Sequence, residues 1–168
     1  MTPRSVQPQP CTDTDCKGQH KPRERIALAA SLCSSRGVQL TKLRRQILEL
    51  VWESGRSTGA YELIEALKRR DSRPVAPPTV YRALEFLMSQ GLVSKIESLN
   101  AYVPCAHPER RQDCLFFVCD ICKAAVEMED RKIARQLSKD AAALGFRTEH
   151  QIVEIKGTCA GCITNVTP

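Results

Sequence analysis

Two Cys-x-x-Cys pairs constrain this chain more than any other feature of its sequence. The first pair is Cys119 and Cys122, the second is Cys159 and Cys162, and 36 residues separate them. Each pair lies near a strand-like apolar run, where a turn can aim two thiolates at one ion, and four thiolates are the usual ligands of a closed structural zinc site. The sequence therefore predicts that these four cysteines bind one zinc ion. Two unrelated redox pairs are the alternative.

The cysteine count also indicates where the protein works. The chain has nine cysteines, and this odd number disfavours a closed set of disulfides. Residues 1–10 lack the apolar segment of a secretory signal, and no apolar run reaches the ~18 residues that a membrane-spanning helix needs. We therefore expect a cytoplasmic protein with reduced thiols. Cys33 lies on an amphipathic stripe and is expected in the core.

Charge is distributed unevenly along the chain. Residues 1–104 contain 16 Lys and Arg against 10 Asp and Glu, whereas residues 105–168 contain 9 of each, so the front part carries the whole net charge of +6. This asymmetry favours a front module that contacts a polyanion. Residues 1–22 have no apolar period and predict a flexible tail. We expect a winged-helix DNA-binding domain over 23–104 and a zinc-binding dimerisation domain over 105–168.

Residues 23–104 have the periodicity of a winged helix-turn-helix. Apolar residues recur at helical spacing, and the last helix is bounded by Pro77-Pro78 at its start and Gly91 at its end. Two short apolar runs then follow, joined by four residues, which is typical of a hairpin. The expected elements are helices over 26–33, 43–50, 60–67 and 77–91, and strands over 92–96 and 101–103.

The rear module is expected to be a small α+β unit, so that the fold class of the whole chain is α+β. Its expected elements are strands over 115–118, 124–128 and 151–155 and one helix that ends at Gly145. The apolar stripe of this helix is expected to face inward and consists of Ile133, Leu137, Ala141 and Leu144. Because so short a sheet cannot enclose a large core, we expect the module to depend on zinc and on a partner subunit.

A second group of metal-binding residue types lies near the junction of the modules. We predict a sensor zinc site formed by Cys105, His107, Cys114 and Glu127, with His150 further along the chain. Mixed sulfur, nitrogen and oxygen ligands bind zinc less tightly than four thiolates, which suits reversible sensing. An ion at Cys105 would touch the hinge after the hairpin. The tail residues Cys11, Cys16 and His20 are left out, because a flexible segment must first be ordered to coordinate an ion.

The helix over 77–91 is expected to read DNA. Arg82 projects from the side opposite Val80, and its guanidinium could bind O6 and N7 of guanine in the major groove. Tyr61, early in the preceding helix, could contact a phosphate or a base edge, and basic residues of the second helix would contact the DNA backbone. The expected DNA-binding residues are Lys42, Arg44, Arg45, Tyr61, Thr79, Tyr81 and Arg82.

Several ordered motifs resemble the ferric uptake regulator family, in particular its zinc-sensing branch. They are the run from Pro77 to Leu84, Gly91-Leu92-Val93, Tyr102 to Cys105, the first cysteine pair, and the run from His150 to Cys162. The resemblance spans about residues 25–163. It implies a homodimeric bacterial repressor, with Tyr61 and Arg82 at the family's base-contacting positions and Cys119, Cys122, Cys159 and Cys162 at its structural zinc ligands.

The resemblance is incomplete at the sensor site. Similar zinc regulators have two histidines where this chain has Ser94 and, nearby in the alignment, Gln112. Cys105 and Glu127 match the family's positions, whereas His107 and Cys114 are proposed substitutes from the adjacent loop.

The sequence thus predicts a zinc-responsive repressor rather than an enzyme. Its dimer would bind double-stranded operator DNA when the sensor site holds zinc, and would control genes of zinc uptake and homeostasis. We expect one structural and one regulatory zinc per subunit, with no membrane and no small-molecule substrate as partner.

Three alternatives are open. A family member that senses iron, manganese, nickel or peroxide is disfavoured by the soft ligand Cys105 and by the presence of only three histidines. A zinc deaminase is disfavoured because Val118 stands where its signature has proline. A thiol redox switch would need accessible thiolates of low pKa.

Overall fold

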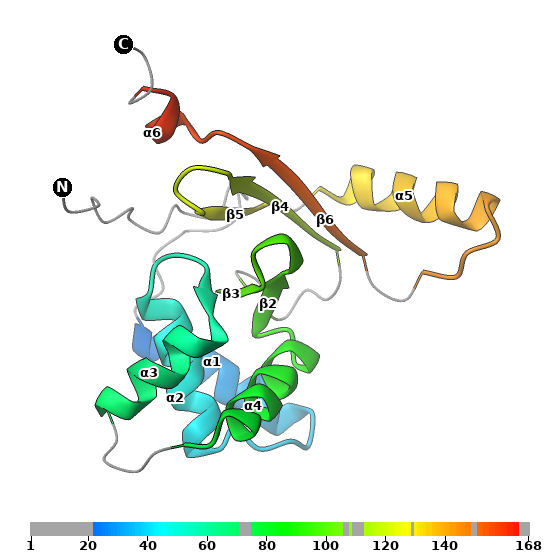
Figure 1. The fold of residues 1–168 in the computed structure, drawn as a ribbon. Coiled ribbons are helices and arrows are strands. Elements are labelled where there is room, and N and C mark those ends of the chain that lie inside the picture. Colours follow the sequence, from blue (N-terminus) through cyan, green and yellow to red (C-terminus); the bar gives the residue numbers. More distant parts are fainter. Residues whose placement is uncertain are drawn as a thin grey trace.

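The chain folds into two parts, each built on a three-stranded sheet (Figure 1). The computed structural model describes residues 22–70, 75–105, 108, 113–128, 130–148 and 151–164. The helices are α1 (Pro22–Ser35), α2 (Lys42–Glu53), α3 (Ala60–Arg70), α4 (Pro77–Ser89), α5 (Arg131–Ala143) and α6 (Ala160–Ile163), with a 3-10 turn η1 (Glu97–Leu99). The strands are β1 (Thr58–Gly59), β2 (Val93–Ile96), β3 (Ala101–Pro104), β4 (Asp113–Cys119), β5 (Ala125–Met128) and β6 (Gln151–Gly157).

Helices α1 to α4 enclose one apolar core. Each helix has apolar residues three or four positions apart, and this spacing places them on one buried face. Ile47, Leu84 and Leu87 are fully buried. In α1 the buried face comprises Ile26, Ala29 and Cys33, and Cys33 is a core residue as expected. Burial raises the pKa of the Cys33 thiol. The four helices predicted for this part of the chain are all present.

Helix α4 begins and ends where the sequence signals it. Pro77 occupies the first turn, where a missing N–H costs nothing. Gly91 has a φ of +67°, a conformation that glycine adopts without strain. The N–H of Leu92 donates to the carbonyl of Leu87 at 2.9 Å and that of Gly91 to Met88 at 2.8 Å, which closes the helix end before the first strand of the wing.

The wing is a hairpin of β2 and β3, with a third strand that the sequence analysis missed. β2 and β3 pair antiparallel, and the turn between them ends at Asn100 in the left-handed region. Thr58 pairs with Tyr102 and Gly59 with Ala101, so β1 joins the sheet on the other side of β3. A two-residue strand is too short to show the alternation by which strands are recognised.

In the second sheet β4 lies between an antiparallel β5 and a parallel β6. The chain crosses from β5 to β6 through α5. Phe116 on β4 is opposite Glu127 on β5 and Glu154 on β6. Because residues in register point to the same face, these three side chains form one row across the sheet.

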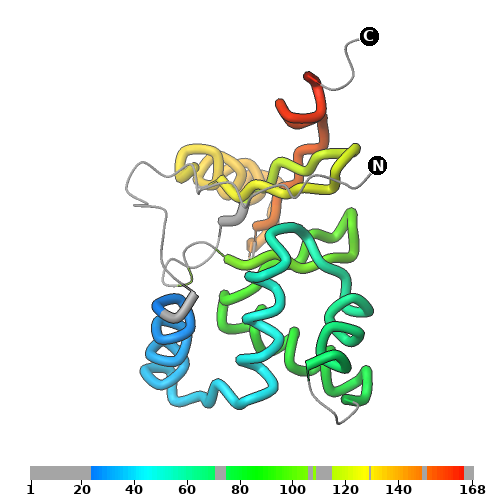
Figure 2. The backbone as a smooth tube through the Cα atoms, turned by 90° about the vertical axis from the view of Figure 1, so that its left-hand side faces the viewer, coloured from blue at the N-terminus to red at the C-terminus, as the bar shows by residue number. Residues whose placement is uncertain are grey.

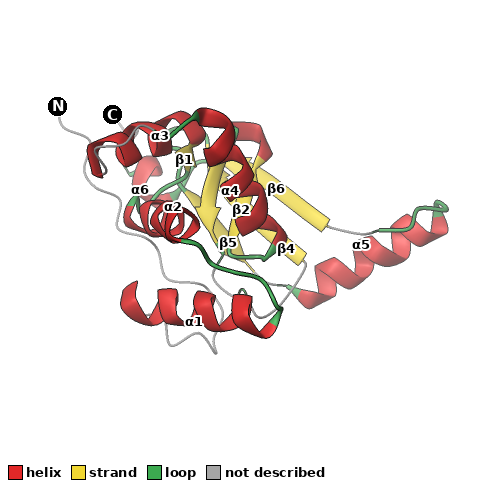
Figure 3. Cartoon of the chain, turned by 90° about the horizontal axis from the view of Figure 1, so that it is seen from below, coloured by secondary structure: helices red, strands yellow, loops and turns green. Residues whose placement is uncertain are grey.

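Helix α5 differs from the expectation. Asp130 caps its N-terminus by accepting hydrogen bonds from the N–H groups of Lys132 and Ile133. The expected inward stripe is wrong for the single chain, because Leu144 is 77% exposed and, in this helix, Ala134 is the residue that the structure buries. Figures 1 and 3 show the reason: α5 extends beyond the end of the sheet instead of covering it.

The two parts meet through a second, small apolar cluster. Ile96 and Val103 from the wing pack there with Phe116 and Val118 from β4. Figure 2 shows the wing lying between the helices and the second sheet. The face of the second sheet that carries Phe116 is therefore covered by the wing, and the residues of its row are directed towards the junction of the two parts.

Candidate metal centres and nucleic-acid interface

The four cysteines of the two pairs come together at one end of the second sheet. β4 and β6 are parallel neighbours, so that Cys119 is opposite Gly157 and both pairs follow at the same edge. The four sulfur atoms all lie within 4.8 Å of one another, and Cys122 Sγ is 3.7 Å from Cys159 Sγ. Zn–S bonds of about 2.3 Å in a tetrahedron place sulfurs about 3.8 Å apart. The arrangement fits a tetrahedral zinc ion.

The pKa values of these thiols are also consistent with a site for a cation. Burial acts to raise the pKa of Cys119, but hydrogen bonds from the backbone N–H groups of Cys122, Cys159 and Ile121 outweigh it and lower the pKa to about 6. In contrast, the Cys159 thiol beside it, together with burial, raises the pKa of Cys162 to about 12. The Cys119 thiol therefore loses its proton readily, whereas the Cys162 thiol does not. A divalent cation at the centre favours the thiolate form of its ligands.

Two of the four predicted sensor ligands lie together at the junction of the two parts. Cys105 follows β3 and its N–H donates to the carbonyl of Leu92 at 3.1 Å. Its Sγ is 3.8 Å from Oε1 of Glu127 on β5. Zinc bound to both would place these atoms about 3.6 Å apart. The pair is therefore close to a spacing at which one ion could contact both.

The other predicted ligands lie partly or wholly outside the described residues. Cys114 lies on β4 opposite Ile152, but its side chain is outside the described part of the chain. His107 and His150 also lie outside the described residues, as do Gln112 and the tail residues Cys11, Cys16 and His20. Ser94, where similar regulators have histidine, lies on β2 opposite Val103.

The residues expected to read DNA are exposed on α3 and α4. Tyr61 lies in the first turn of α3 and is 76% exposed. Thr79, Tyr81 and Arg82 lie in the first half of α4 and are exposed, while Val80 between them is fully buried. The buried residue fixes the rotation of the helix, so that Tyr81 and Arg82 are directed to solvent.

The basic residues of α2 are held in different ways. The guanidinium of Arg44 lies 3.4 Å from the centre of the Phe86 ring and donates to the carbonyl of Gln39 at 2.7 Å. Arg45 forms an ion pair of 2.9 Å with Glu49, and Lys42 is exposed. Arg44 thus joins α2 to α4, a role that residue types alone did not indicate.

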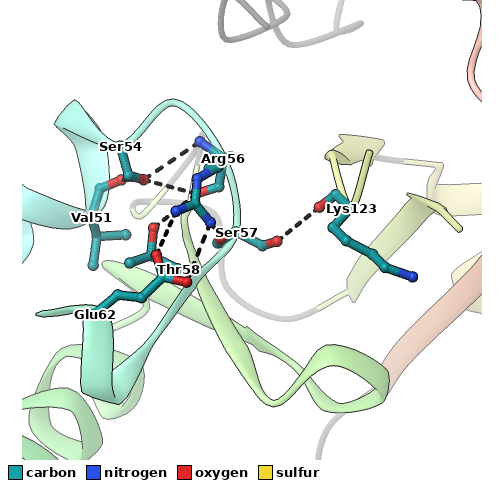
Figure 4. A network of polar contacts seen from close by, with 7 residues as sticks. All are labelled: Val51, Ser54, Arg56, Ser57, Thr58, Glu62 and Lys123. Carbon is teal, nitrogen blue, oxygen red and sulfur yellow. Dashed lines mark hydrogen bonds and ion pairs between the residues drawn. The ribbon is translucent and has the colours of Figure 1, made fainter. Parts of the chain in front are cut away.

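Two polar contacts that the sequence does not predict join the two parts. Ser57, which is buried, donates from its hydroxyl to the carbonyl of Lys123 at 2.8 Å (Figure 4). Glu154 accepts hydrogen bonds from the N–H groups of Glu97 and Ser98 at 2.6 and 3.2 Å. The partners are 66, 57 and 56 positions apart, and no local pattern marks such pairs.

Residues 35–156 match the family model described as the ferric uptake regulator family, which is more than half of the chain. The chain therefore belongs to this family. Its similarity within the family is to the zinc uptake regulators: it is 38% identical to the zinc uptake regulation protein of Escherichia coli (strain K12) over 143 residues, which are 84% of this chain and 82% of that protein.

Solved structures give the same family and distinguish two states of one relative. A zinc uptake regulator complexed with zinc and DNA has a TM-score of 0.82 at 34% identity, covering 88% of this chain and 98% of that one. Holo XcZur has a TM-score of 0.76 at 44% identity, with 83% and 96% covered. Apo XcZur, at 42% identity with 84% and 97% covered, has a TM-score of 0.50.

Within the described residues, every helix is too short or too polar to cross a lipid bilayer.

Proposed function

We propose that this chain is a zinc-responsive transcriptional repressor. The observation that supports this most is the combination, in one member of the ferric uptake regulator family, of an exposed helix α4 on a winged helix with a cluster of four cysteines that fits zinc. The dimer would bind operator DNA in the cytoplasm and control genes of zinc uptake and homeostasis. The similarity to a zinc uptake regulator complexed with zinc and DNA supports both ligands.

In this proposal each subunit holds two zinc ions with different tasks. Cys119, Cys122, Cys159 and Cys162 hold the structural ion, which ties the end of β4 to the segment after β6. The regulatory ion is held by Cys105 and Glu127, with His107 and Cys114 as the further ligands. A mixed ligand set exchanges metal more easily than four thiolates do, so only the second site responds to free zinc.

The regulatory site connects metal binding to the position of the DNA-binding domain. When bound, zinc supplies the positive charge that allows a thiolate and a carboxylate to lie next to each other as ligands of one ion. Cys105 ends the wing and Glu127 belongs to the second sheet. Holding these side chains together holds the wing against the sheet, and thereby fixes how each α4 of a dimer is presented to its half-site.

DNA contacts are assigned by exposure and chemistry. Arg82 would bind a guanine edge, and Tyr61, Thr79 and Tyr81 would contact neighbouring bases or phosphates. Lys42, Arg44 and Arg45 would contact the DNA backbone. We expect Arg82→Ala to weaken operator binding by about 1–3 kcal/mol and to relax the preference at one base pair, without loss of folding. Binding to an operator series with single base changes, at fixed salt, measures both effects.

The dimer is proposed from apolar surface that the single chain leaves open. Phe117 and Ile155 are opposite each other on β4 and β6, on the face away from the wing, and both are exposed. Leu137 and Leu144 on and after α5 are exposed as well. Several exposed large apolar side chains in one small domain are typical of a subunit interface.

The central experiment measures operator binding at fixed salt with zinc and with chelator. We expect zinc to raise the affinity about 5- to 150-fold, the usual range of allosteric coupling. Equal affinity in both conditions would contradict zinc sensing. A stronger response to iron, manganese or nickel than to zinc would identify a family member with another signal.

Variants of the regulatory ligands locate the response. Cys105→Ser and Glu127→Gln should remove most of the zinc effect while keeping the structural ion, and His107→Ala and Cys114→Ser test the two ligands proposed from the loop. Cys33→Ser is the matched control, because it changes a cysteine that lies in the core of the winged helix. Loss of the zinc response in this control would place the effect in folding rather than in sensing.

A further inference from the structure

The carboxylate of Glu154 lies at the start of the turn that forms the tip of the wing. Its Oε1 accepts from the N–H of Glu97 at 2.6 Å and its Oε2 from the N–H of Ser98 at 3.2 Å. The first N–H groups of a helical turn have no partner within the turn. The residue before η1, Ile96, offers no side-chain cap. Glu154, on a strand of the other domain, thus supplies the cap that the wing itself lacks.

This contact shares a row of side chains with the regulatory site. Glu127, Phe116 and Glu154 are in register across β5, β4 and β6. At one end of the row Glu127 lies beside Cys105, and at the other Glu154 holds the wing tip. Between them Phe116 is fully buried against Ile96 and Val103 of the wing. One rigid row therefore contacts the base of the wing and its tip.

A second polar contact lies on the other side of the wing sheet. Ser57, just before β1, donates to the carbonyl of Lys123, which directly follows the first cysteine pair. Figure 4 shows this hydroxyl directed away from the Arg56–Glu62 ion pair and towards the second domain. Lys123 has a φ of +60°, and its own N–H donates back to the carbonyl of Cys119. The turn that presents this carbonyl is thus part of the cysteine knuckle.

Both contacts belong to one domain arrangement. The chain is far more similar to holo XcZur than to apo XcZur, with TM-scores of 0.76 and 0.50 at nearly equal identity. The two structures of that relative have nearly the same sequence identity to this chain, so the difference in TM-score comes from their conformations. The contacts of Glu154 and Ser57 thus occur in a structure that matches the holo form of that relative more closely than its apo form.

We propose that Glu154 is a positioning residue that caps the wing tip and, together with Ser57, stabilises the domain arrangement in which this repressor binds DNA. The inference rests on the proposed function and adds to it a contact remote from the metal ligands. The carboxylate is charged at neutral pH: burial acts to raise the pKa of Glu154, but hydrogen bonds from the Ser98 side chain and from the two N–H groups lower it below its ordinary value.

The test separates positioning from metal binding. A contact that favours the binding-competent arrangement lowers the amount of zinc needed to reach it. We expect Glu154→Gln, which keeps the shape but loses one acceptor oxygen and the charge, to raise the free zinc concentration at half-maximal operator binding about 3- to 10-fold. This lies at the low end of allosteric couplings because the contact is partly exposed. The affinity at saturating zinc should change less.

A direct readout accompanies the titration. Amide hydrogen exchange of the zinc-loaded dimer should show protected N–H groups at Glu97 and Ser98, and Glu154→Gln, which keeps a single acceptor oxygen, should lose the protection of at least one of them. The matched control is Asp140→Asn, which removes one negative charge from α5 in the same domain, where the carboxylate accepts a hydrogen bond from Gln136 of the same helix. Ser57→Ala should shift the zinc requirement in the same direction as Glu154→Gln.

The outcomes are distinguishable. Operator binding by the wild type that ignores zinc overturns the proposed function and this inference with it. A zinc-dependent wild type with an unchanged midpoint in Glu154→Gln overturns the inference alone. Loss of bound zinc or of the dimer in Glu154→Gln also overturns it, since the effect would then act through folding. If that variant does not fold, Ser57→Ala decides by the same midpoint.

Discussion

The two domains of this chain are stabilised in different ways. In the winged helix, Ile47, Leu84 and Leu87 are fully enclosed by α1 to α4. In the second domain, α5 buries Ala134 among its described residues, and Phe117 and Ile155 remain exposed on the sheet. The first domain therefore has its own apolar core, whereas the second leaves apolar surface exposed and brings four cysteines together at one end of its sheet.

The magnitudes explain why both solutions work. A fully buried Leu or Ile contributes about 1.5–3 kcal/mol, so the apolar cluster of the winged helix is a large favourable contribution to the folding free energy of that domain. Structural zinc bound by a small domain contributes about 10–16 kcal/mol at neutral pH. One ion can thus replace several core side chains. The contrast between the domains yields four predictions, from the largest effect to the smallest.

Removing the proposed structural ion should produce the largest difference in stability between the two domains. We expect Cys119→Ser to lose the tightly bound zinc and the order of the second sheet, because the ion no longer ties the end of β4 to the segment after β6. The helices of the first domain should persist. Metal analysis and domain-resolved hydrogen exchange measure both effects. A variant that keeps its zinc and its sheet would contradict the structural role, and Cys33→Ala provides the control for cysteine replacement outside the cluster.

Truncating the core should produce the opposite pattern. Leu84 has no exposed surface, and Leu84→Ala should destabilise the winged helix by about 2–5 kcal/mol through lost burial and a cavity. The zinc content should not change. Urea unfolding followed together with zinc release tests this, and simultaneous loss of zinc would show that the domains unfold as one unit.

A charge on the open sheet face should act on assembly alone. Phe117 is 42% exposed on β4, and we expect Phe117→Asp to weaken the dimer by about 2 kcal/mol or more, the size of an interface hot spot. Sedimentation over a concentration series measures the dimer. Leu28→Asp, on α1 with 40% exposure, introduces the same charge in the first domain and should leave the dimer unchanged.

The smallest effect is expected at an exposed ion pair. Arg45→Ala breaks the contact with Glu49 along α2 and should cost about 0.3–0.5 kcal/mol of stability. If Arg45 also contacts a phosphate, the same variant lowers operator affinity uniformly across sequences and reduces its salt dependence. Unfolding and salt-dependent binding measurements separate the two roles, and unchanged binding would restrict Arg45 to its ion pair.

The features that could be predicted from sequence were those with a local signal. Pro77 and Gly91 mark the bounds of α4, and the spacing of the cysteine pairs predicts a cluster that the structure brings together. In contrast, β1 has two residues and no period, and the apolar stripe of α5 predicts a burial that the described residues do not provide at Leu137 and Leu144.

The interdomain contacts had no sequence signal at all. Glu154 accepts from backbone N–H groups, which every residue except proline carries, so its partners leave no mark in the sequence. The hydroxyl of Ser57 likewise contacts a carbonyl. A sensor role for Cys105 and Glu127 is predicted by residue type and resemblance, and the structure adds that the two side chains are close in space.

The parallel pairing of β4 with β6 imposes an order on the maturation of the protein. During synthesis the winged helix leaves the ribosome complete, and its mostly local contacts let it fold early. The strand β6 and the second cysteine pair emerge afterwards, and β4 has no parallel neighbour until then. A nascent chain can consequently possess α4 before the four cysteines of the proposed zinc site can meet, so a translation product truncated before residue 159 would carry the proposed DNA-binding helix without the proposed structural ion.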